Sequence, residues 1–403
     1  MKVAAAFAGL LAVASASPQY VKTPAAPKNG NGINPFEGTE YYVNARFQKT
    51  VDSSIKQFEK AGEKNLVKAS KVVRDISTFV WIDTIASIKE KLDVVLPDAA
   101  KKAKSSKKPV LLPLVVYNLP ERDCSAKASA GELYVAQNGV AKYKKYVDDI
   151  ASRLAKYQGK NIKFAISIEP DSLPNLVTNV DNPATPEVEG VPKCDAAGPY
   201  YKDLIAYTIK KLQFPDVTLY LDAAHGNWLG WNMKGAADIY TEVLKKAAPA
   251  TIRGYTINVS NYNPVNGDPL EPRVQWNPAY DEAHFALEFG NLLKNNYSAP
   301  HQFVIDTARN GGWPIKEWTA GAQWCNIKGA GIGARPSAVN VLPNVDAFAW
   351  VKTPGESDGT SDSTAERFDE TCAKEPALQP APEAGAWFHE QFKMLLLNSK
   401  PAL

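Results

Sequence analysis

A polar side chain follows each of seven short apolar runs in the sequence, and most of these side chains are carboxylates. They are Asp83, Asp123, Asp171, Asp222, Asn258, Asp306 and Lys352. One polar residue after a strand is an ordinary turn residue or helix cap, but its recurrence after every run indicates a shared site. A protonated carboxyl paired with a second carboxylate is the arrangement that cleaves glycosidic bonds.

Tryptophans supply the second group of candidate residues. Trp81, Trp228, Trp231 and Trp324 are the candidates for stacking on the flat C–H faces of sugar rings. Trp228 and Trp231 lie in the segment HGNWLGW, which indicates an exposed aromatic platform. The positions of Trp350 and Trp387 are more typical of core residues.

The apolar runs predict strands that are buried on both faces, because they are nearly continuous rather than alternating. Their bounds are Phe79–Asp83, Val110–Leu119, Ile162–Glu169, Val217–Asp222, Ile252–Ser260, Gln302–Asp306 and Ala347–Lys352. Stretches with helical spacing lie among them, at Val147–Tyr157, Tyr200–Leu212, Ala236–Ala247, Tyr280–Lys294 and Trp387–Leu397. This alternation predicts an α/β fold, a distorted (β/α) barrel with seven parallel strands, with a doubly wound open sheet as the alternative. In a barrel the polar residues would meet at the carboxyl end of the strands.

Composition excludes several classes of function. The 403 residues include 46 Lys and Arg against 43 Asp and Glu, a balance that gives no support to binding of nucleic acid or of acidic membranes. No apolar stretch is long enough for a membrane span. The sequence contains no GxSxG elbow, no P-loop and no zinc-site spacing, so we expect no metal site.

The start of the chain indicates secretion. Residues 1–16 have a basic start, an apolar run and a small-residue cleavage site, as in a signal peptide. Residues 17–33 are expected to form a flexible leader, and residues 34–403 one catalytic domain. The four cysteines, Cys124, Cys194, Cys325 and Cys372, favour two disulfides in an oxidising compartment, with three pairings possible.

Seven segments together resemble glycoside hydrolase family 6, most closely its fungal cellobiohydrolases. They are LVVYNLPERDC, IEPDSLPNLVTN, YLDAAHGNWLGW, NVSNYN, WCN, WVKTPGESDGTSDS and QPAPEAGAWF, in the family's order and spacing. The resemblance implies a distorted barrel of seven parallel strands that cleaves the β-1,4-glucan chains of cellulose and cello-oligosaccharides with inversion. It also implies release of cellobiose from the non-reducing end without a cofactor, by a protein that we expect to be a monomer.

The resemblance also implies a role for individual residues. Asp171 matches the general acid, and Asp123 the carboxylate that keeps this acid protonated and helps to organise the catalytic water. Asp358 matches a proposed base, for which a water chain leading towards Asp123 and including Ser129 is the rival account. The residues that match sugar contacts are Tyr117, Trp81, Asp83, His225, Trp228, Trp231, Asn261, Trp324, Lys352 and Glu356. Asp222 matches a carboxylate that supports the acid, with an ion pair to Arg309 or Arg122 as the alternative.

Two long loops decide the expected mode of action. We expect the disulfides Cys124–Cys194 and Cys325–Cys372 to brace the loops Cys124–Gly139 and Pro354–Pro382, which would meet over the site as a tunnel. The alternatives are mobile loops, an endoglucanase of the same family with an open cleft, a retaining glycosidase, and a non-catalytic glucan-binding barrel. Three departures from the family pattern stand out: Ala224 replaces a common glycine, Asn182–Val191 is an insertion, and no cysteine-rich cellulose-binding module is found, so tight adhesion to crystalline cellulose is not expected.

Overall fold

One curved parallel sheet forms the centre of the computed structural model, which describes residues 32–188, 190–267, 277–315, 323–338 and 341–403. The expected signal peptide and nearly all of the expected leader lie outside the described residues. The sheet runs β3 (Val110–Val116), β4 (Ile162–Ile168), β7 (Val217–Asp222), β8 (Gly254–Ile257), β9 (Gln302–Asp306) and β10 (Val345–Ala349). At the other edge of β3, β1 (Glu40–Tyr41) and β2 (Val80–Ile82) pair with successive parts of the same strand.

Every pairing in this sheet is parallel. Six of the seven predicted runs contain a whole strand, and the seventh, Ala347–Lys352, overlaps only the last three residues of β10. The predicted fold is therefore confirmed as a half-barrel, and the open doubly wound sheet is wrong. Both faces of the strands are buried, as the continuous apolar runs predicted. In β3, Leu112 and Leu114 face the core beneath the outer helices, whereas Leu111 and Val115 face the barrel interior.

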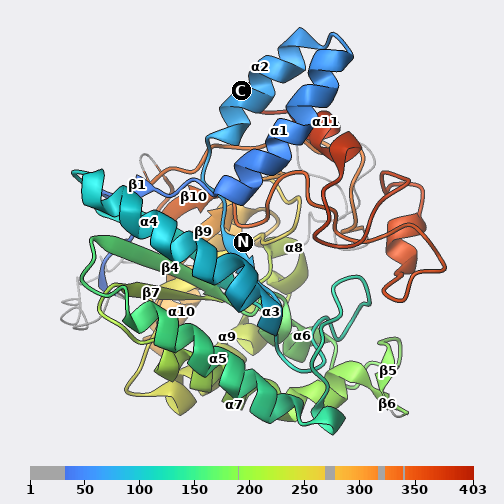
Figure 1. Cartoon of the computed structure of the whole chain (residues 1–403). Coiled ribbons are helices and arrows are strands. Elements are labelled where there is room, and N and C mark those ends of the chain that lie inside the picture. Colours follow the sequence, from blue (N-terminus) through green and yellow to red (C-terminus); the bar gives the residue numbers. More distant parts are fainter. Residues whose placement is uncertain (1–31, 189, 268–276, 316–322, 339–340) are drawn as a thin grey trace, which may run out of the picture.

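Helices cover the sheet on its outer side (Figure 1). The five predicted helices correspond to α5 (Gly139–Ala155), α7 (Lys193–Lys211), α9 (Met233–Ala247), α10 (Glu282–Tyr297) and α11 (His389–Leu397). The structure adds α1 (Ala45–Lys60), α2 (Lys64–Arg74), α3 (Ile85–Ser87), α4 (Asp93–Ser105), α6 (Ser172–Thr178) and α8 (Gly226–Leu229). The expected insertion contains the short hairpin of β5 (Glu187–Val188) and β6 (Val191–Pro192). Among the described residues no helix is both long and apolar enough to cross a membrane.

The barrel has a seam between β2, at one edge of the sheet, and β10, at the other. The amide of Phe79, just before β2, donates to the carbonyl of Trp350, just after β10, at 3.0 Å. In the part of the chain that the structure describes, β2 and β10 share no strand pairing. Helix α1 packs with α2 and α11 around the buried Trp350 and forms a second core, and Figure 1 shows these three helices grouped at one end of the molecule.

Candidate active site

The carboxyl ends of the strands border a cavity of about 680 Å³. Nearly all the residues proposed from the sequence line it. They are Asp171, Asp123, Asp358, Tyr117, Ser129, Trp81, Asp83, His225, Trp228, Asn261, Trp324, Lys352 and Glu356. The exceptions are Trp231, which is 52% exposed and lies outside the cavity wall, and Asp222, Asn258 and Asp306, which are buried and do not line the cavity. The cavity therefore gathers carboxylates and aromatic rings that are far apart in the sequence.

Asp171 is held at the start of α6 with its carboxyl facing the cavity. Its backbone is left-handed, with φ 64°, and its amide donates to Oδ2 of Asp222 at 2.9 Å. The pKa of the Asp171 carboxyl is raised well above its ordinary range, first by burial and then by nearby negative charge. The charges come from Asp222, Asp123 and Asp358. Such a carboxyl stays protonated at a pH where an exposed one has lost its proton.

Asp222 supports this arrangement without an ion pair. Its Oδ2 accepts from the amides of Asp171 and Ala224, at 2.9 and 3.1 Å. The alternative of an ion pair with Arg309 or Arg122 is wrong, because Arg309 pairs with Asp358 and Arg122 donates to backbone carbonyls. Burial raises the pKa of Asp222 to about 7, although both amides oppose the shift.

Asp123 lies beside the first cysteine of a disulfide. Its Oδ2 accepts from the amide of Ser129 at 2.7 Å, and its backbone is also left-handed, with φ 59°. Burial raises the pKa of its carboxyl, while the Ser129 amide and the charge of Lys193 oppose that shift. Left-handed backbone at non-glycine residues costs about 1–3 kcal/mol and is concentrated at functional sites. The strain at Asp123 and Asp171 fits that pattern.

Asp358 is buried in a network of donors. Arg309 donates to its Oδ1 at 2.7 Å, while the Tyr262 hydroxyl and the Asn326 amide donate to its Oδ2 at 2.6 and 2.8 Å. Arg309 is itself 1% exposed and lies over the Tyr262 ring. Both carboxylate oxygens of Asp358 therefore accept hydrogen bonds from protein donors, and this carboxylate is held in place from three sides.

One part of the cavity wall is charged, and within it Asp83 is paired with Lys91. Asp83 accepts from Lys91 at 2.7 Å and from Ser87 at 2.6 Å, and these contacts lower the pKa of its carboxyl against the effect of burial. Lys352 lies 5.8 Å from the centre of the Trp81 ring. Burial lowers the pKa of Lys352, and it raises the pKa of the neighbouring Glu356.

Another part of the cavity wall presents His225, Asn261 and Trp228. Burial lowers the pKa of His225 to about 3, so the ring is neutral. Its Nε2 lies 2.9 Å from Nδ2 of Asn261. The indole N–H of Trp228 donates to the hydroxyl of Thr178 at 2.8 Å, which fixes the ring against α6.

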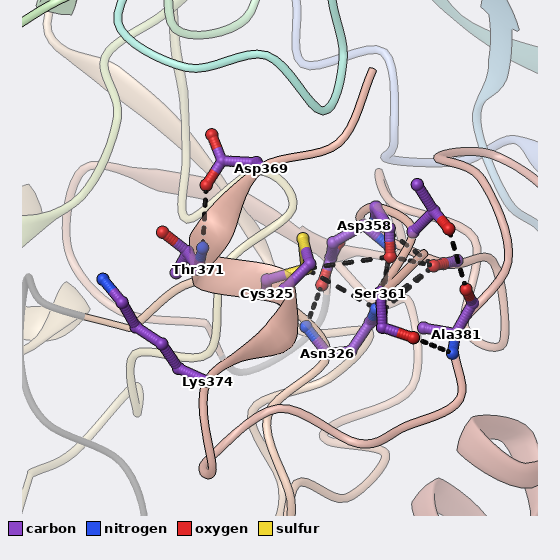
Figure 2. The surroundings of a disulfide bond; sticks show 12 residues. Cys325, Asn326, Asp358, Ser361, Asp369, Thr371, Lys374 and Ala381 are labelled. Atoms are coloured by element: carbon purple, nitrogen blue, oxygen red, sulfur yellow. Dashed lines mark hydrogen bonds between the residues drawn. A yellow bond between two sulfur atoms is a disulfide. The ribbon is translucent and has the colours of Figure 1, made fainter. Parts of the chain in front are cut away.

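The two loops expected to cover the site touch each other. The amide of Lys127 donates to Oδ2 of Asp369 at 3.2 Å, and Ala128 packs against Cys325 and Cys372. The disulfides pair as expected, Cys124 with Cys194 and Cys325 with Cys372. Figure 2 shows Cys325 between the Asp369–Thr371 hydrogen bond and the contacts of Asn326 with Asp358. One disulfide therefore joins the loop contact to the segment that holds Asp358.

Several residues of the cavity were not found from the sequence. Trp387 was assigned to the core, but it lines the cavity, and its indole N–H donates to Ser54 at 3.0 Å. The start of α1 contributes Asn44, Arg46, Phe47 and Thr50. The signal for α1 was present, because its apolar residues recur at helical spacing. Within the described residues no group of side chains suitable for holding a metal ion is found.

Comparison with known proteins places this geometry in context. The family model described as Glycosyl hydrolases family 6 matches residues 36–399. The chain is 42% identical to a protein of Aspergillus clavatus named probable 1,4-beta-D-glucan cellobiohydrolase C, over 92% of this chain and 77% of that protein.

Solved structures agree with this match. A glycoside hydrolase family 6 enzyme from Coprinopsis cinerea superposes with a TM-score of 0.85 at 42% identity, covering 92% of this chain and 99% of that one. Cellobiohydrolase II of Humicola insolens, solved in complex with glucose and cellotetraose, superposes with a TM-score of 0.85 at 38% identity, covering 92% and 100%.

Proposed function

The chain belongs to glycosyl hydrolase family 6, and from this we propose that it is a secreted cellobiohydrolase. It cleaves the β-1,4-glucosidic bonds of cellulose and cello-oligosaccharides with inversion and releases mainly cellobiose from the non-reducing end. The observation that carries this proposal is the half-buried Asp171, whose carboxyl has a raised pKa and which lines a cavity together with further carboxylates and tryptophans.

Asp171 acts as the general acid. Departure of a sugar alkoxide is slow unless its oxygen is protonated as the bond breaks. The raised pKa of Asp171 supports this role, because it keeps a proton on the carboxyl at a pH where an ordinary aspartate has lost it. Asp222 holds the Asp171 amide and so fixes the direction of the acid towards the cavity.

Asp123 and Ser129 guide the attacking water. In an inverting reaction, a water attacks the sugar carbon from the face opposite the leaving group and gives up a proton to a base. Both oxygens of Asp358 are already engaged by protein donors. We therefore assign the proton of the water to Asp123, whose carboxyl has a raised pKa and is reached through a water chain beside Ser129.

The tryptophans bind the glucan chain by stacking. Trp81, Trp228 and Trp324 line the cavity and take successive sugar rings. Trp231 is exposed outside the wall, where it binds the chain before it enters. The neutral His225 and the paired Asp83 contact sugar hydroxyls by hydrogen bonds.

The roof favours cutting from chain ends. An open cleft admits the middle of a polymer, whereas loops that meet over the site admit only a threaded chain end. The contact of Lys127 with Asp369 and of Ala128 with the disulfide Cys325–Cys372 supports the second arrangement. It favours a cellobiohydrolase over an endoglucanase of the same family.

Secretion and a monomeric state complete the proposal. Disulfides persist in oxidising compartments outside the cytosol, and both cysteine pairs are joined here. The cavity and its roof are built from one chain, so the site needs no second subunit.

The test follows the first product formed from cellohexaose. Proton NMR during early turnover should show the α-anomer of cellobiose before mutarotation sets in, and chromatography should show cellobiose as the main product. The β-anomer would indicate a retaining mechanism. Release of mixed lengths from the start would contradict a cellobiohydrolase. The Asp171→Asn variant controls for contaminating activity.

A further inference from the structure

The first residue of α7 is a buried lysine. Lys193 is 7% exposed, and lysine side chains are seldom buried to this degree unless the amine has partners. Its Nζ donates to the carbonyl of Arg122 at 2.8 Å and lies 3.4 Å from the carbonyl of Asp123. The amine therefore contacts the two peptide groups that flank Asp123, the proposed acceptor of the water proton.

The neighbours of these residues are joined as well. Cys194, the next residue of α7, forms a disulfide with Cys124, the next residue of the loop. Further along the helix, the hydroxyl of Tyr201 donates to the carbonyl of Glu121 at 2.9 Å. Helix α7 therefore contacts each residue from Glu121 to Cys124, and Lys193 supplies the contacts in the middle of this segment.

The anchored segment has a strained backbone. Glu121 and Asp123 are both left-handed, with φ 57° and 59°, and such conformations persist where surrounding contacts hold them. Asp123 accepts from the amide of Ser129, and the guanidinium of Arg122 donates to the carbonyl of Ser129 at 2.9 Å. Lys193 therefore holds both residues of the Asp123–Ser129 contact, one directly and one through Arg122.

We propose that Lys193 is a positioning residue for hydrolysis: its amine holds the peptide between Arg122 and Asp123, and its charge keeps the Asp123 carboxyl ionised. Lys193 does not line the cavity, so it acts through Asp123 and not on the sugar. The inference rests on the proposed function, in which Asp123 takes a proton from the attacking water.

Charges of both signs surround the Asp123 carboxyl. Burial raises its pKa, while the Ser129 amide and the charges of Lys193 and Arg122 lower it. Burial lowers the pKa of Lys193, and the charges of Asp123 and Glu121 oppose that shift. The other titratable groups that interact with the Asp123 carboxyl are Asp369, Asp171, Tyr117 and Tyr201. Loss of the Lys193 charge should therefore keep Asp123 protonated up to a higher pH.

The pH profile separates this role from a merely structural one. Lys193→Met removes the donor and the charge, and we expect kcat on cello-oligosaccharides to fall about tenfold with little change in KM. The acidic limb of kcat/KM should move to higher pH, because Asp123 must be ionised to accept a proton. Lys210→Met, at an exposed position of the same helix, is the matched control. An acidic limb that stays in place would overturn the inference, whatever happens to kcat.

Two further variants separate the donor from the charge. Lys193→Gln keeps an N–H donor without a charge, so we expect a smaller loss of kcat than in Lys193→Met and the same direction of shift in the acidic limb. Tyr201→Phe removes a neighbouring anchor of the loop but no charge, so its acidic limb should match that of the wild type. A shift in Tyr201→Phe as large as in the Lys193 variants would contradict the role given to the charge.

The effect of the charge can also be measured without catalysis. ¹³C spectra of protein labelled at its aspartate carboxyls follow the titration of Asp123, and its signal is assigned with the Asp123→Asn variant. We expect Asp123 to titrate at a higher pH in Lys193→Gln than in the wild type. Equal titration in the two proteins would refute the inference. Absence of hydrolysis in the wild type would instead refute the proposed function and leave this comparison standing.

Discussion

The amide of Asp171 donates to Oδ2 of Asp222 at 2.9 Å, and this bond joins the ends of two neighbouring strands. Asp171 follows β4, and Asp222 is the last residue of β7. The bond holds Asp171 in its left-handed conformation and brings two carboxyls together in a buried place. Burial, and then the charge of Asp222, raises the pKa of Asp171, so this contact both positions the acid and helps to keep it protonated.

Replacement of Asp171 should abolish turnover and leave binding in place. We expect Asp171→Asn to reduce kcat on unactivated cello-oligosaccharides by about 10²-fold or more, because general acid catalysis contributes about 10²–10⁴-fold. Calorimetric titration with cellotetraose should show that binding survives, since the tryptophans remain. A decrease in kcat of less than about tenfold would show that Asp171 is not the general acid.

The same variant should be more stable than the wild type above neutral pH. The folded-state pKa of Asp171 lies above its unfolded value, so the wild type loses stability as the pH rises from about 4 towards the folded pKa. Asparagine has no charge to bury, and we expect Asp171→Asn to melt several degrees higher at pH 8, with the gain shrinking near pH 4. Scanning calorimetry across this range measures the effect, with the exposed Asp203→Asn as control. A gain that does not depend on pH would show that it has another cause.

Asp123→Asn should move the alkaline limb of the pH profile to lower pH. The Asp123 charge raises the pKa of Asp171, and the acid must be protonated to act. Without that charge the pKa of Asp171 is lower, so the acid loses its proton at a lower pH. Turnover should also fall about tenfold or more, because the proposed acceptor for the water proton is lost. The measurement is kcat/KM against pH, and an unmoved alkaline limb would show that the two carboxyls are not coupled.

Gly359 should control how firmly the roof closes. A Cβ at this position would lie 2.6 Å from Sγ of Cys372 and 2.7 Å from Cβ of Ala128. Gly359→Ala therefore pushes the two loops apart, and we expect more internal cutting of carboxymethylcellulose for each new reducing end. Gly198→Ala, where a Cβ meets only ordinary contacts, is the matched control. Cleavage of a short chromogenic oligosaccharide separates damage to the neighbouring Asp358 from opening of the roof. An unchanged ratio of viscosity loss to reducing ends would show that this contact does not hold the roof.

The parts of the fold that could be predicted are those in which burial produces a recognisable pattern of apolar residues. Strands covered on both faces appear as continuous apolar runs, and all seven were found. Helix α1 was missed although Phe47, Val51, Ile55 and Phe58 recur at helical spacing. The helical spacing does not predict where α1 packs, because its position at the seam depends on how far the sheet closes.

The site could be predicted where residues follow strands, and not where tertiary contacts choose the partner. Arg122 holds the loop before Asp123 by donating hydrogen bonds to the carbonyls of Tyr117 and Asp83. No pattern in the sequence predicts such contacts between a side chain and the backbone. Glu282, in the first turn of α10, contacts Asn263 because this turn packs against the segment that follows β8. Trp387 was assigned to the core because it begins a stretch with helical spacing, but it lines the cavity.

The central claim is that a roofed site cuts a threaded glucan chain from its end. The most direct measurement follows the viscosity of carboxymethylcellulose against the reducing ends released by the wild-type protein, with soluble cellobiose measured in parallel. A cellobiohydrolase should release reducing ends, mostly as cellobiose, while the viscosity falls slowly. A steep early fall in viscosity with few new ends would show internal cutting and would contradict the account.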